Sequence, residues 1–178
     1  MDSTHPKDTE TDGPLLVEAG IIAVPTELSL HAIDFLRDGR SRFAQVKCFD
    51  FVPSNYENAW AALSCLERGT LCEWGSGLGI VVGLAEMLGY QASGIELDPD
   101  LAETSRELLL AHGLSATITT GSYLDSLDSL DYYYVYSWPS QIAGVEKRFS
   151  EVANDRSKLL ICYGQDQLKC MTLRLFDH

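Results

Sequence analysis

Two acidic residues flank a glycine-rich segment that has the spacing of a nucleoside-cofactor site. Glu73 opens the segment Glu-Trp-Gly-Ser-Gly-Leu-Gly, which ends at Gly79, and Glu96 follows the glycines after a further apolar run. Closely spaced glycines let the backbone turn tightly and let a ligand approach the main chain, because no Cβ atom stands in the way. A carboxylate roughly 20 residues further on lies where ribose hydroxyls can donate to it. The spacing predicts a Rossmann-type cofactor site.

The glycine spacing helps to distinguish between cofactors. Gly75, Gly77 and Gly79 are spaced G-x-G-x-G, whereas a dinucleotide fingerprint is G-x-G-x-x-G and would place its third glycine at Ile80. A nicotinamide-dependent Rossmann enzyme is therefore disfavoured but stays open as an alternative. The segment resembles the first motif of class I methyltransferases that use S-adenosylmethionine, E/D-x-G-x-G-x-G after a strand. The resemblance implies that Glu73 lies near the cationic amino group of the methionine part and that the turn carries no pyrophosphate.

The same resemblance implies which residues bind S-adenosylmethionine and its product S-adenosylhomocysteine. Many relatives have Asp at the position of Ser122, where it accepts from the adenine amino group. A serine hydroxyl can accept the same bond, Asp125 can substitute for it, and Tyr123 can contact the ring. The predicted cofactor-binding residues are Phe51, Ser54, Glu73, Gly75, Ser76, Gly77, Gly79, Glu96, Leu97, Ser122 and Tyr123. For Phe51 and Ser54, at the entry of a helix before the first strand, a core position and a helix cap are equally good interpretations.

The methyl acceptor is expected at the end of a tyrosine-rich strand, residues 131–136. Ligands of open α/β sheets bind beyond the carboxyl ends of the strands, so the candidate catalytic residues are Tyr136, Ser137 and Trp138. Together with Tyr56 they would form an aromatic pocket, which lowers the pKa of a lysine amine by disfavouring its charged form. Ser137-Trp138-Pro139 does not match the N/D-P-P-Y/F/W motif of amino-adenine and amino-glutamine methyltransferases. Most of the tyrosines are explained by packing in the core.

Further short matches resemble the lysine N-methyltransferases that act on the c-type ring protein of ATP synthase. They cover residues 51–164 and comprise Phe-Val-Pro-Ser at 51–54, the glycine motif, Gly-Ile-Glu-Leu-Asp-Pro at 94–99 and the pair Ser105-Arg106. The resemblance implies a protein lysine N-methyltransferase. The chain departs from that pattern at Glu73-Trp74, Leu78 and Ser122. A non-catalytic Rossmann domain that binds a protein partner therefore remains a second alternative.

Alternating strand and helix patterns predict an α/β fold, a Rossmann-like doubly wound and mostly parallel sheet with helices on both faces. Strands are expected at 71–74, 92–96, 116–120, 131–136, 158–163 and 168–175, and helices at 54–67, 80–88, 98–112 and 141–150. Only 15 residues follow position 163. We therefore expect a shortened C-terminal end, in which the last segment returns as a hairpin.

The N-terminal third is expected to differ from the rest. Residues 1–13 are polar and predict a disordered tail. Residues 14–50 form an N-terminal cap or extension, with one or two short strands in 15–24 and a helix that starts at 25–27 and ends at Gly39. Residues 51–178 form the cofactor-binding domain.

Composition limits the classes of partner. The 178 residues carry a net charge of −13, which makes nucleic acid an unlikely partner and favours a basic protein or a small cationic molecule as acceptor. The five cysteines contain no C-x-x-C pair, so neither a metal site nor a disulfide framework is expected. No apolar run has the length of a membrane span and the N-terminus lacks a signal-peptide pattern. We therefore expect a cytoplasmic monomer or dimer.

Overall fold

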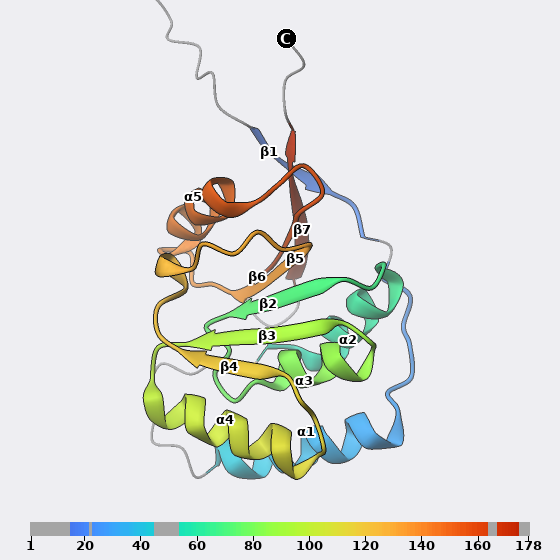
Figure 1. Cartoon of the computed structure of the whole chain (residues 1–178). Helices are drawn as coiled ribbons and strands as arrows, with labels where there is room; N and C mark the ends of the chain where they lie inside the picture. The colour runs from blue at the N-terminus through green and yellow to red at the C-terminus, as the bar shows by residue number, and fades with distance from the viewer. Residues whose placement is uncertain (1–14, 22, 45–53, 164–166, 175–178) are drawn as a thin grey trace, which may run out of the picture.

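The structure is a computed structural model that describes residues 15–21, 23–44, 54–163 and 167–174. Within these residues a single sheet of seven strands has the order β1-β7-β6-β5-β2-β3-β4 (Figure 1). Its central strands are parallel and comprise β2 (Thr70–Trp74), β3 (Gln91–Glu96), β4 (Thr117–Thr120), β5 (Tyr132–Tyr136) and β6 (Lys158–Tyr163). The predicted Rossmann-like α/β fold is confirmed.

Helices cover both faces of the sheet. They are α1 (Leu30–Phe43), α2 (Tyr56–Cys65), α3 (Ile80–Met87), α4 (Pro99–Ala111) and α5 (Ile142–Val152). The first four contribute to one apolar core, in which α1 packs against α3 and α4, and α5 supplies Val145, Phe149 and Val152 to a separate core on the other face. In the described part of the chain no helix is both long enough and apolar enough to cross a membrane.

The tyrosine-rich strand β5 packs both faces of the sheet. Tyr132 and Tyr134 belong to the core under α2 and α3, whereas Tyr133 belongs to the core under α5. The Tyr133 ring packs against Trp74 and Phe149, with ring centroids 4.9 and 5.4 Å apart. This alternation follows from the period of two in a strand. It confirms that most of these tyrosines are core residues.

The two ends of the described chain complete the sheet together. β7 (Gln167–Arg174) returns antiparallel to β6, which confirms the predicted C-terminal hairpin. β1 (Leu15–Ala19) then pairs antiparallel with β7. The segment expected as a cap or extension therefore adds a strand to the sheet, and it covers the edge that β7 would otherwise expose to other chains. The predicted tail at 1–13 lies outside the described residues.

Two helix boundaries differ from those predicted. α1 begins after Ser29, whose side chain accepts from the Ala32 N–H, and it continues through Gly39. Gly39 does not end the helix because its lack of a side chain is needed for packing, since a Cβ there would lie 2.4 Å from Ile80 Cδ1. α2 is capped by Asn55, which accepts from the Asn58 N–H, and not by Ser54. Asn and Ser are similarly good caps, so the sequence did not separate these neighbours.

Candidate functional site

The predicted glycine turn connects β2 to α3 and has the backbone conformation that requires glycine. Gly75, Gly77 and Gly79 have φ values of 73°, 52° and 68°. The turn is fixed to the next strand, because the Gly75 and Ser76 N–H groups both donate to the Ile95 carbonyl, at 2.8 and 3.0 Å. A Cβ on Gly75 would meet nothing within 4 Å, whereas one on Gly79 would lie 2.2 Å from Ser105 Oγ. Gly75 therefore leaves space for a ligand, and Gly79 allows close packing against α4.

Glu96 ends β3 beside this turn and is held by two backbone groups. Its carboxylate is buried and accepts from the Gly77 N–H at 2.7 Å and from the Asp98 N–H at 2.8 Å. A carboxylate has about four lone-pair positions, so positions remain for the two hydroxyls of a ribose. Leu97 follows with 71% of its surface exposed, at the mouth of the site. The predicted pairing of the glycine turn with this acid is present in the structure.

Glu73 lies on the other side of the turn and is also buried. Its Oε2 accepts from the Val82 N–H, 3.2 Å away in the first turn of α3, where the helix dipole favours negative charge. Burial raises the pKa of Glu73 well above its usual range; the Val82 hydrogen bond acts in the opposite direction, and the Glu96 charge raises the pKa further. No ion pair in the described residues involves either acid.

A polar cluster under the start of α2 borders Glu73. Tyr134 pairs with Glu73 across β5 and β2, and its hydroxyl is hydrogen-bonded to the Ser54 side chain. Burial raises the pKa of Tyr134 and of Tyr56, and the Glu73 charge contributes to both shifts. Ser54 and Tyr56 were predicted near the site, whereas Tyr134 was not singled out from its strand. Only the register of β5 against β2 could have identified it. Phe51 lies outside the described residues.

The predicted catalytic residues follow β5 at its carboxyl end. The Tyr136 and Trp138 rings meet edge to face, with centroids 6.1 Å apart, and Trp138 is 45% exposed. Ser137 is buried; its N–H donates to the Cys162 carbonyl and its hydroxyl to the Trp138 carbonyl, 3.2 Å away. These bonds give Ser137 a structural function. Its catalytic role, and those of Tyr136 and Trp138, stay predictions.

The predicted adenine contacts lie after β4. Ser122 caps the short helix Tyr123–Asp125 through a bond from the Leu124 N–H. The Tyr123 ring stacks on Trp74, with centroids 5.1 Å apart and an interplanar angle of 11°, so one face of the ring is already occupied. Ser122 and Asp125 line a cavity of about 430 Å³ together with polar residues of β3 and β4. Both remain available for the adenine contact, which stays a prediction.

The strand register arranges the site as a row. Trp74 pairs with Ile95 on one side and with Val135 on the other, so the next residues, Gly75, Glu96 and Tyr136, lie at the same level. Tyr136 pairs with Cys162, which pairs with Leu168. The row therefore runs from Glu96 past the glycine turn to Tyr136 and on to β7.

Comparison with known proteins gave a relative and several similar structures, and no known family model matches the chain. The relative is a human lysine N-methyltransferase named for the C-type component of ATP synthase. It is 27% identical over 121 residues, which are 65% of this chain and 52% of that protein. The chain thus spans about half the length of this relative.

Two solved structures share the fold. The methyltransferase PaMTH1 of Podospora anserina, bound to S-adenosylhomocysteine, has a TM-score of 0.61 at 16% identity, over 75% of this chain and 62% of that one. A methyltransferase of Geobacter sulfurreducens has a TM-score of 0.60 at 14% identity, over 84% of this chain and 92% of that one. At these identities the similarity concerns the fold alone.

Proposed function

We propose that this chain, which has the fold of the class I S-adenosylmethionine-dependent methyltransferases, binds S-adenosylmethionine and transfers its methyl group to a nucleophile. The observation that carries the proposal is the pair of buried acids, Glu73 and Glu96, on the two sides of the glycine turn. A buried carboxylate that has no cationic partner is costly. A ligand that combines a positive charge with ribose hydroxyls would compensate both acids.

The same geometry argues against a dinucleotide. In dinucleotide-binding folds the pyrophosphate lies at the helix N-terminus after the glycine turn. Here the Glu73 carboxylate accepts from the Val82 N–H in the first turn of α3. A pyrophosphate at that position would meet the carboxyl group, which would have to remain protonated. The cationic cofactor therefore fits these residues better than NAD(P).

The chain's own residues would mainly position and shield the reactants. S-adenosylmethionine, when bound, supplies a methyl group on a sulfonium sulfur; the acceptor's lone pair forms the new bond to carbon while the carbon–sulfur bond breaks and its electron pair stays on sulfur. Glu96 would hold the ribose and Glu73 the amino group. Tyr136 and Trp138 would border the transferred methyl and exclude water, which favours an in-line approach of the acceptor.

We further propose that the acceptor is the side-chain amine of a lysine in a protein. The net charge of −13 favours a basic protein, and the human relative is named for lysine N-methylation. A lysine amine must lose its proton before it can attack, and the proton passes to solvent. The aromatic rings of Tyr136 and Trp138 would favour the neutral amine by desolvating it.

Calorimetric titration with S-adenosylhomocysteine and with NADH tests the cofactor. We expect binding of S-adenosylhomocysteine only, and a Glu96→Gln variant that binds it at least about tenfold more weakly, because a charge-assisted bond to a ribose hydroxyl contributes about 1.5–3 kcal/mol. Glu107→Gln, at an exposed position on α4, is the matched control and should bind normally. Binding of NADH in place of S-adenosylhomocysteine would overturn the proposal.

A further inference from the structure

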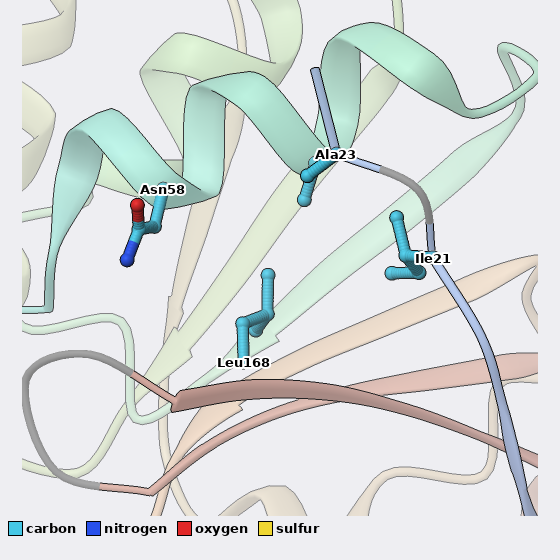
Figure 2. Close-up of a pocket in the computed structure, with 5 residues that line it drawn as sticks. Ile21, Ala23, Asn58 and Leu168 are labelled. Atoms are coloured by element: carbon cyan, nitrogen blue, oxygen red, sulfur yellow. The ribbon is translucent and has the colours of Figure 1, made fainter. Parts of the chain in front are cut away.

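An open pocket lies at the far end of the row that begins at Glu96. Its lining residues are Ile21, Ala23, Asn58, Ala62 and Leu168, and its volume is about 180 Å³. Figure 2 shows α2 on one side of the pocket, β7 on the other, and the segment that carries Ile21 and Ala23 along a third side. The Asn58 side chain projects from α2 toward β7.

The strand register relates this pocket to the expected methyl position. Leu168 pairs with Cys162, and Cys162 pairs with Tyr136. Neighbouring strands are about 4.8 Å apart, so Leu168 lies about 10 Å from Tyr136 along the row. Leu168 packs against the same core as Tyr134, which places the pocket on the face of the sheet that carries Glu73. The pocket therefore continues the site on the side opposite the ribose acid.

The lining of the pocket fits one chemical class of group. Four of its side chains are aliphatic, and the fifth is an amide, which can both donate and accept a hydrogen bond. No charged side chain of the described residues lines it. A water-sized group occupies about 30 Å³, so the pocket has room for a side chain of the size of leucine. An amide at the rim is a suitable partner for a peptide group.

We propose that this pocket receives an aliphatic side chain of the acceptor protein, two or three residues from the methylated lysine, while Asn58 bonds to the acceptor backbone. This inference rests on the proposed function. An extended peptide rises about 3.3 Å per residue, so it spans the distance from Tyr136 to Leu168 in about three residues. The pocket would then select lysines that have a leucine-like neighbour.

Methyl-group NMR of the full chain with S-adenosylhomocysteine tests this without requiring turnover. The probes are nine-residue peptides with a central lysine, glycine and serine elsewhere, and one leucine placed in turn at each of the other positions. We expect a peptide with leucine two or three residues from the lysine to shift the Ile21 and Leu168 methyl signals and to bind about tenfold more tightly than the peptide without leucine. Ala23→Trp, at an exposed position, should remove the shift and the preference by filling the pocket.

The control is Leu127→Trp, which places the same ring at a site that is 84% exposed and away from the pocket; it should keep both. Equal binding of all peptides, or pocket signals that no peptide shifts, would overturn the inference. So would a change in oligomeric state in Ala23→Trp, which would identify the pocket as a contact between copies of the chain. Failure of S-adenosylhomocysteine to shift the Ile95 methyl would instead count against the proposed function, since the peptide result is read at other residues.

Discussion

At the scale of single residues, the two acids of the site are similarly buried but differently satisfied. Glu96 accepts from two backbone N–H groups, Gly77 and Asp98, whereas Glu73 accepts from Val82 alone. Burial raises the pKa of Glu73 well above its usual range. Glu73 is therefore the acid whose ionisation opposes folding in the absence of a cationic ligand.

Replacing Glu73 by Gln tests this directly. An acid whose folded-state pKa lies above its unfolded value, about 4.3, binds more protons when folded, so the unfolding free energy falls as the pH rises above that value. Glutamine cannot ionise and still offers an oxygen to the Val82 N–H. We expect the ligand-free Glu73→Gln variant to be more stable than the parent at pH 7, with the difference shrinking toward pH 4. Urea unfolding at both pH values measures it, and a constant difference would contradict the assignment.

At the scale of elements, the glycine turn serves both ligand and packing. Alanine at a left-handed position costs about 1–2 kcal/mol in backbone strain alone. Gly79→Ala adds a clash with Ser105 Oγ, so we expect it to destabilise the protein more than Gly75→Ala. Gly75→Ala meets only empty space and should mainly weaken the binding of S-adenosylhomocysteine. Thermal unfolding with and without this ligand separates the effects, and the reverse ranking of stability would exclude our account of the turn.

The starts of β2 and β5 are held together by one carboxylate. Asp131 accepts from the Thr70 N–H at 2.9 Å and from its hydroxyl at 2.8 Å, and these bonds hold the pKa of Asp131 below its usual range. A depressed pKa contributes stability above the unfolded value, which is lost as the pH falls through the folded one. Asp131→Asn should therefore cost about 1 kcal/mol at pH 7 and progressively less below pH 4. Asp100→Asn, at an exposed position in the first turn of α4, serves as the control in the same pH series.

At the scale of the whole molecule, the sheet depends on segments from both ends of the chain. β1 pairs with β7 along its full length, and Leu16 packs beside the core that contains Leu173. A charge at Leu16 would be placed against this apolar surface. We expect Leu16→Asp to lower the unfolding free energy by about 1–3 kcal/mol. Glu18→Gln, which removes only an exposed pair with Lys169, should change it by less than about 1 kcal/mol; equal effects would show that β1 contributes little.

The sequence alone determined the local features of this protein. The order of strands and helices, the glycine turn after β2, the acid at the end of β3 and the Asp98 cap of α4 all follow from short-range patterns. Backbone conformation and hydrophobic period act within a few residues. The fold and the pairing of the glycine turn with its acid could therefore be predicted before any contact between distant segments was known.

Only the tertiary structure decided which distant residues lie together. That β1 pairs with β7, that Gly39 lies against Ile80, and that Tyr123 stacks on Trp74 depend on strand register and helix packing. The pocket between Asn58 and Leu168 joins segments more than a hundred positions apart in the chain. Such contacts depend on the sum of many weak packing terms across the molecule, which no local pattern encodes.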